Sequence, residues 1–122
     1  MIMRPVAAFV VSFVAFAAPA TAQAHAHLNR ASPAAGSTVT PAPKEVVLSF
    51  TEKLEPEFST IEVRDAKDTA VQTGKASLDP AIPAQLRVAL KPLPPGTYTV
   101  IWRVLSVDTH RTNGSFTFRV GP

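Results

Sequence analysis

The three histidines of this 122-residue chain occupy two short segments, one near each end. His25 and His27 follow an apolar leader, and His110 comes two residues after Asp108 in the polar segment SVDTHRTNG at residues 106–114. Imidazole nitrogens and carboxylate oxygens are common ligands of divalent transition metals. Residues two apart in an extended backbone point to the same side, so Asp108 and His110 can converge on one ion. We therefore predict a metal site that joins the N-terminal segment to this late loop.

Residues 1–24 predict a secretory signal peptide. Arg4 is followed by an apolar run over residues 6–18, then by Pro19 and the small-residue sequence ATAQA, which is the order typical of such peptides. The run is about half of the ~20 residues that a membrane-spanning helix needs. Since no later stretch stays apolar for longer, we expect an exported chain with no transmembrane segment in its mature form.

The cleavage site decides which residue carries the α-amine. The triplet AQA directly ahead of His25 satisfies the small-x-small rule, so cleavage after it would leave His25 first. Cleavage two residues later would leave His27 first, and cleavage two residues earlier would leave Gln23 first. The α-amine and the Nδ1 of a terminal His25 can close a six-membered chelate ring on one metal. Together with His110 and Asp108 they would supply three nitrogens and one oxygen.

This set of donors suits Cu(II), which such sites bind more tightly than zinc or nickel. The chain has no cysteine, and its only methionines, Met1 and Met3, belong to the leader. The mature chain would lack the sulfur ligands that Cu(I) prefers, so we expect copper to be released on reduction. Binding should weaken in acid, because the amine and the imidazoles must lose protons to coordinate. Zinc stays possible where copper is scarce.

Length and charge set further limits on function. Residues 25–122 form a chain of 98 residues, enough for one small domain. The whole chain has 12 Lys and Arg against 9 Asp and Glu. Without Arg4 the difference falls to two, which is too small and too scattered to indicate nucleic-acid binding. An exported domain without cysteine must depend on its apolar core, because it can form no disulfides.

Alternating apolar and polar residues predict β-strands, and no 3.6-residue pattern is sustained. The residues expected to face the core are Val46, Leu48, Phe50, Ile61, Val63, Leu86, Val88, Leu90, Tyr98, Val100, Trp102, Val104, Phe116, Phe118 and Val120. Turn residues separate these stretches, and Asn113-Gly114 is expected to be one of the turns. The pattern predicts an all-β fold, an immunoglobulin-like Greek-key β-sandwich or barrel of about seven strands.

Three stretches resemble the CopC family of periplasmic copper-resistance proteins: HAHLNRASPAAGS, VVLSFTEKL and LPPGTYTVIWRVLSVDTHRTNGSFTFRV. The resemblance covers nearly the whole mature chain, as a CopC-like domain at residues 25–122. It implies an immunoglobulin-like fold that binds Cu(II) through the first mature residue and an Asp-x-His pair, here His25, Asp108 and His110. It also implies that Glu52 lies beside the copper as an outer hydrogen-bond acceptor, although an ordinary surface glutamate would look the same.

Two binding modes stay open. In a histidine brace, copper is held by the amine and imidazole of His25 together with Asp108 and His110. In the amino-terminal copper motif, His27 at mature position three would bind together with the amine and two deprotonated amides. We favour the brace, because it uses Asp108 and His110 and leaves His27 as an additional or outer ligand.

The resemblance implies a periplasmic carrier or buffer in copper resistance rather than an enzyme. Such a protein would sequester Cu(II) or pass it to an inner-membrane transporter of the CopD type. The chain lacks the methionine-rich stretch that gives some relatives a Cu(I) site. Two other functions stay open: a copper-brace oxidative enzyme that cuts polysaccharides, and a metal-free immunoglobulin-like adhesion or assembly module. An Asp-x-His in a loop is often only a hydrogen-bonded turn.

Overall fold

The computed structural model describes Met3 and residues 26–122, so His25 and nearly all of the expected signal peptide lie outside the described residues. Within them the chain forms eight strands and one short 3-10 helix. Their bounds are β1 Leu28–Ser32, β2 Thr38–Val39, β3 Glu45–Phe50, η1 Pro56–Phe58, β4 Thr60–Arg64, β5 Gln72–Ser77, β6 Gln85–Leu90, β7 Gly96–Leu105 and β8 Arg111–Val120. No helix in this part of the chain has both the length and the apolar character to cross a bilayer.

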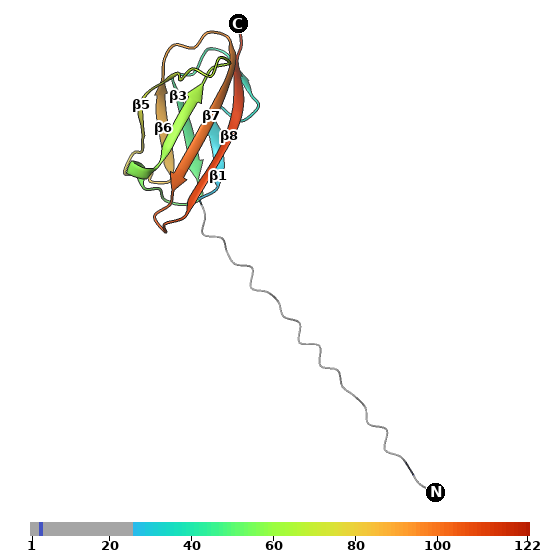
Figure 1. Ribbon diagram of the computed structural model, residues 1–122, viewed down its shortest axis with the longest axis vertical. Coiled ribbons are helices and arrows are strands. Elements are labelled where there is room, and N and C mark those ends of the chain that lie inside the picture. Colours follow the sequence, from blue (N-terminus) through green and yellow to red (C-terminus); the bar gives the residue numbers. More distant parts are fainter. Residues whose placement is uncertain (1–2, 4–25) are drawn as a thin grey trace.

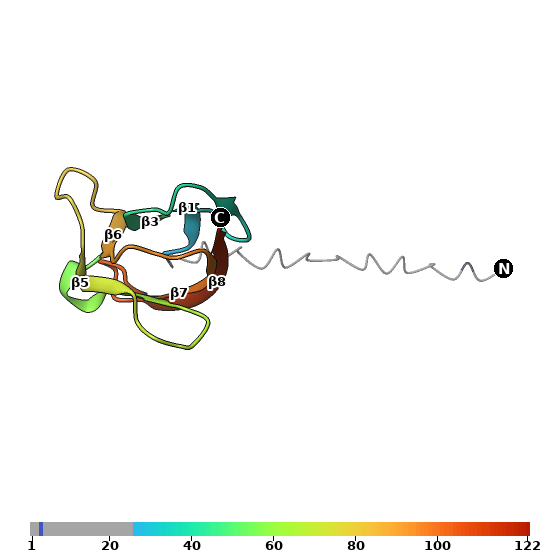
Figure 2. The ribbon, with the colours of Figure 1, turned by 90° about the horizontal axis from the view of Figure 1, so that it is seen from above.

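The strands form two four-stranded sheets, in the orders β1-β3-β6-β5 and β2-β8-β7-β4. Figure 2 shows them as two layers that face each other, with β1, β3 and β6 in one and β7 and β8 in the other. All pairings are antiparallel except that of β2 with β8. The predicted all-β Greek-key sandwich is confirmed, and the two-residue strand β2 brings the number of strands to eight.

The core lies between the two sheets and follows the predicted alternation. Six of the residues expected to face inward are completely buried: Val46, Leu48, Val63, Leu86, Val100 and Phe118. Leu90 and Phe116 are only partly buried and pack at the margin of this core. The Trp102 indole packs edge-on against Phe50 of the opposite sheet, with 5.2 Å between the ring centroids. The period-two pattern therefore identified the buried face of each main strand.

The predicted turn at Asn113-Gly114 is wrong, because both residues lie inside β8. Asn113 pairs with Arg103 and Gly114 pairs with Trp102. A Cβ atom at position 114 would lie 2.5 Å from Cζ2 of Trp102, so the indole occupies the place of a side chain. Gly114 is therefore needed for close approach of the ring to the neighbouring strand. The loop between β7 and β8 is correspondingly short, residues 106–110.

Gly114→Ala is expected to lower the free energy of unfolding by about 1–3 kcal/mol, the usual cost of overpacking a filled site. Urea unfolding followed by Trp102 fluorescence would measure the change. Ser115→Ala is the matched control, because Ser115 is the exposed neighbour in β8 and its change should have little effect. Equal stability of the two variants would contradict this explanation of Gly114.

The fold brings three separate segments to one end of the sandwich. The loop between β7 and β8 and the start of β1 both lie at the end opposite the C terminus (Figure 1). The segment after β3 joins them, because the Val107 N–H donates to the Lys53 carbonyl at 3.0 Å and Leu54 forms a β-bridge with Ser106. The candidate ligands Asp108 and His110 lie in the loop at this end.

Candidate metal centre

Residues 106–110 form a tight turn that joins β7 to β8. The Ser106 N–H donates to the His110 carbonyl at 3.0 Å, and the Thr109 N–H donates to the Ser106 carbonyl at 2.9 Å. Thr109 has a φ of 73°, in the left-handed region that a β-branched residue rarely adopts. The spacing of Asp108 and His110 was interpreted as that of an extended backbone, and this interpretation is wrong because the backbone here turns. The turn, and not the alternation of a strand, brings Asp108 and His110 together.

The Asp108 carboxylate is held at one of its two oxygens. Its Oδ1 accepts hydrogen bonds from the Ser106 hydroxyl and from the His110 N–H, the latter at 3.3 Å, and lies 3.2 Å from the His110 Nδ1. Ser106 is completely buried, so its hydroxyl is a fixed donor. The hydrogen bond from Ser106, followed by the contacts with His110, lowers the pKa of the Asp108 carboxyl, although partial burial opposes this. The Asp108 side chain is therefore a negatively charged carboxylate at neutral pH.

The other oxygen of Asp108 has the properties of a metal ligand. Asp108 Oδ2 is buried and has no hydrogen-bond partner in the part of the chain that the structure describes. Buried polar atoms are nearly always paired, so one that is not requires an explanation. A bound cation would satisfy its lone pairs, and carboxylate oxygen with imidazole nitrogen suits copper or zinc. The pair of Asp108 and His110 therefore fits a metal ion.

This pair is not a complete metal site in the described residues. Across residues 26–122, no three side chains of the types His, Cys, Asp and Glu gather closely enough to hold a metal ion. The predicted third contributor, His25, lies outside the described residues. The contribution of His25 as a further ligand therefore stays a prediction.

Ala26, the first described residue of the N-terminal segment, is hydrogen-bonded to the strand that follows the Asp108–His110 pair. Ala26 is completely buried, and its carbonyl accepts a hydrogen bond of 2.8 Å from the hydroxyl of Thr112, two residues after His110. Ala26 is therefore tied to β8 two residues after His110, and the contribution of His25 stays a prediction.

Glu52 lies in the segment that contacts both the N-terminal segment, at His27, and the late loop, at Val107. Its neighbour Thr51 exchanges two hydrogen bonds with His27, both of 2.9 Å. Its other neighbour, Lys53, accepts the bond from Val107 in the loop. The Glu52 side chain is partly buried, and no hydrogen bond or ion pair joins it to another described residue. The predicted role of Glu52 as an outer acceptor stays a prediction.

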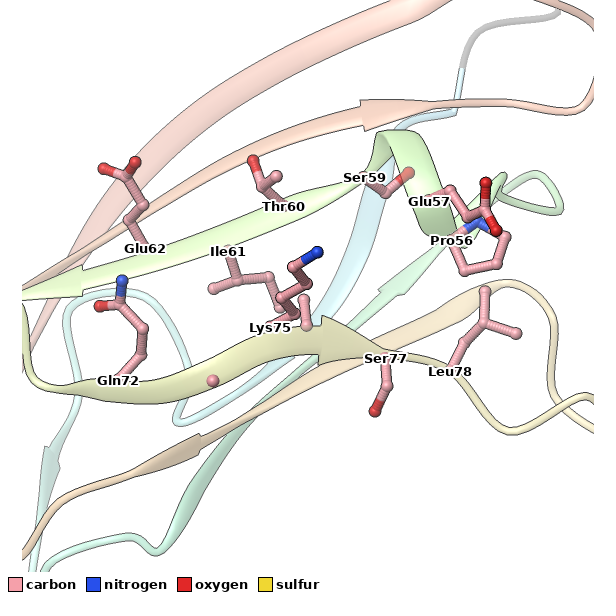
Figure 3. A pocket seen from close by; sticks show the side chains of 12 residues that line it. Pro56, Glu57, Ser59, Thr60, Ile61, Glu62, Gln72, Lys75, Ser77 and Leu78 are labelled. Atoms are coloured by element: carbon pink, nitrogen blue, oxygen red, sulfur yellow. The ribbon is translucent and has the colours of Figure 1, made fainter.

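The candidate centre lies apart from a groove along the side of the sandwich. This groove, of about 800 Å³, runs between β4 and β5 and includes Ile61, Gln72 and Lys75 in its lining. Figure 3 shows these three side chains in the space between the two strands. Asp108 and His110 do not line it. The candidate ligands therefore lie at the end of the sandwich, not in this groove along its side.

Three residues that support the site were missed from the sequence: Ser106, Thr51 and Thr112. Their hydroxyls contact Asp108, His27 and Ala26 respectively. Serine and threonine are frequent in turns and strands for other reasons, so their types give no signal. The pairing of β1 with β3 places Thr51 beside His27, and the turn at residues 106–110 places Ser106 beside Asp108. Thr112 meets Ala26 because β8 of one sheet contacts the segment ahead of β1 in the other sheet.

Comparisons of the sequence and of the structure with known proteins point to the same family. The profile of the CopC domain family matches residues 28–121. Protein YobA of Escherichia coli K12 is 44% identical over 98 residues, which are 80% of this chain and 79% of that protein. Copper resistance protein C of Xanthomonas campestris pv. juglandis is 38% identical over 96% of both chains. The crystal structure of CopC from Methylosinus trichosporium OB3b superposes with a TM-score of 0.76 at 36% identity, covering 80% of this chain and 95% of the other.

Proposed function

The chain belongs to the CopC family, and from this we propose that it is a periplasmic Cu(II)-binding protein that acts in copper resistance as a carrier or buffer. Membership confirms the resemblance found in the sequence. A relative of this family is named copper resistance protein C. The observation that carries the proposal is the buried Oδ2 of Asp108, which lies beside His110 and has no hydrogen-bond partner among the described residues.

In this proposal residues 1–24 are removed on export and His25 becomes the first residue. Its amine and imidazole bind Cu(II) together with Asp108 and His110, and Glu52 accepts a hydrogen bond from the amine or from a bound water. The mature chain would contain neither methionine nor cysteine, so Cu(I) would be held poorly and reduction would release the metal. A membrane transporter of the CopD type is the proposed recipient, and sequestration is the alternative use of the same site.

The hydrogen bonds of residues 26 and 27 favour the brace over the amino-terminal copper motif. That motif requires copper to bind the deprotonated amide nitrogens of Ala26 and His27. In the structure the His27 N–H instead donates to the Thr51 hydroxyl, and Ala26 is completely buried. Copper could bind these amides only if this part of the chain left its place. We therefore propose that the His27 side chain is not needed for Cu(II) binding.

The mature wild-type chain is expected to bind one equivalent of Cu(II), and His27→Ala is expected to bind it with the same affinity and electron paramagnetic resonance spectrum. Titration against a competing Cu(II) chelator would measure the affinity. Both proteins must begin at His25, because an extra residue would block the amine. A wild-type chain that binds no copper would refute the proposed function. A spectrum that changes in His27→Ala would refute the brace and support the amino-terminal motif.

A further inference from the structure

Two threonines hold one peptide group of the N-terminal segment from opposite sides. The carbonyl of Ala26 accepts a hydrogen bond from Thr112 Oγ1 at 2.8 Å, and the N–H of His27 donates to Thr51 Oγ1 at 2.9 Å. These two groups belong to the same peptide unit, which is planar. Fixing both groups therefore fixes the orientation of the whole unit between β8 and the segment that follows β3.

The same contacts fix the register of this segment. The Thr51 N–H donates to the His27 carbonyl at 2.9 Å, and the next pair along β1 and β3 is Leu28 with Phe50. The methyl group of Ala26 fills a completely buried position. A slip by one residue would place an imidazole in that position, since histidines stand on both sides of Ala26, and would break the three hydrogen bonds. Register is strongly specified where one face is buried in this way.

From this arrangement we propose that Thr51 and Thr112 are positioning residues that select how Cu(II) is bound. This inference rests on the proposed function of the site. By holding the Ala26–His27 peptide group, the two hydroxyls keep the His27 nitrogen protonated and turned toward Thr51. In the proposal this leaves the amine and imidazole of His25, and not the backbone amides, to bind Cu(II) with Asp108 and His110. The brace keeps all of these hydrogen bonds, whereas the amino-terminal motif must break them.

The test is the double variant Thr51→Val and Thr112→Val in the mature chain that begins at His25. Valine keeps the β-branched shape but removes both hydroxyls. Cu(II) affinity is expected to fall about tenfold, which corresponds to about 1.4 kcal/mol. A second, square-planar component with nitrogen ligands should appear in the resonance spectrum, and it should disappear when His27→Ala is added. In the metal-free protein, amide hydrogen exchange at His27 should become faster.

Two further variants separate positioning from general stability. Thr112→Ser keeps the hydroxyl and should retain the wild-type affinity and spectrum. Thr117→Val removes an exposed hydroxyl elsewhere in β8 and should also behave like the wild type. If the double variant keeps the affinity, the spectrum and the slow exchange of the His27 amide, the inference is overturned while the proposed function stands. If the wild-type chain binds no Cu(II), both are overturned, whatever the exchange rates show.

Discussion

Replacement of His110 by alanine in the mature chain is expected to remove tight Cu(II) binding. The Nδ1 of His110 lies 3.2 Å from the Oδ1 of Asp108, and His110 is the only histidine of the late loop. Its loss would take away one of the three proposed nitrogen ligands and also a contact that orients the carboxylate. Losing even an outer-shell partner of a metal site commonly costs 10–100-fold in affinity. We therefore expect a loss of at least about 100-fold, measured by competition with a Cu(II) chelator.

The matched control for this experiment is His27→Ala, which removes the other described histidine and should leave the affinity unchanged. The His110 side chain is 49% exposed, so alanine there should leave no large cavity and the fold should persist. Circular dichroism and the urea midpoint would verify this. If His110→Ala bound Cu(II) as tightly as the wild type, His110 would not be a ligand. The proposed site would then be wrong.

Cu(II) is expected to raise the melting temperature of the mature chain by on the order of 15 °C or more. A ligand that binds only the folded state adds about 4 kcal/mol at a thousandfold excess over its dissociation constant. In a domain of this size, each kcal/mol corresponds to about 4–8 °C. The proposed ligands come from both ends of the mature chain, so they can meet only when the sandwich is folded. Differential scanning calorimetry at increasing Cu(II) would show the shift.

The sharpest control for this experiment is the same chain with Ala24 retained ahead of His25. The extra residue converts the α-amine of His25 into an amide and should remove most of the shift. A chain that begins at His25 but carries Asp108→Asn should also lose most of it. An equal shift in the protein that retains Ala24 would mean that the terminal amine is not a ligand.

The main strands could be predicted because each buries one face. In β7, for example, Tyr98, Val100, Trp102 and Val104 alternate with more exposed residues, and this pattern directly reflects the contact with the opposite sheet. The strands β1 and β5 were not predicted, because their sequences LNRAS and QTGKAS are mainly polar. Both lie at the edge of their sheet, where pairing with one neighbour, and not burial, defines the strand.

The position of Gly114 shows a second limit of prediction from the sequence. Asn-Gly is typical of tight turns because both residues tolerate a positive φ. In this chain the glycine serves instead to admit the indole of Trp102, which lies on the neighbouring strand. A preference that depends on a partner twelve residues away cannot be read from the local sequence.

The candidate ligands Asp108 and His110 could be named from residue type and spacing, but the reason for their proximity could not. Their side chains meet because of a turn with Thr109 in the left-handed region and because a buried Ser106 holds the carboxylate. The hydroxyls of Thr51 and Thr112 could not be assigned a role, since their partners are backbone atoms of residues 26 and 27. Residue types indicate what can bind a metal, whereas the contacts that hold it ready depend on the fold.

The central claim is that a terminal His25 binds copper together with Asp108 and His110, and the intact mass of the exported protein tests it most directly. Untagged protein purified from a copper-supplied periplasm should be measured under native and denaturing conditions. We expect the denatured mass of a chain that begins at His25, and a native mass that is higher by one copper ion. A chain that begins at a residue other than His25, or one that begins at His25 and carries no copper, would contradict the account.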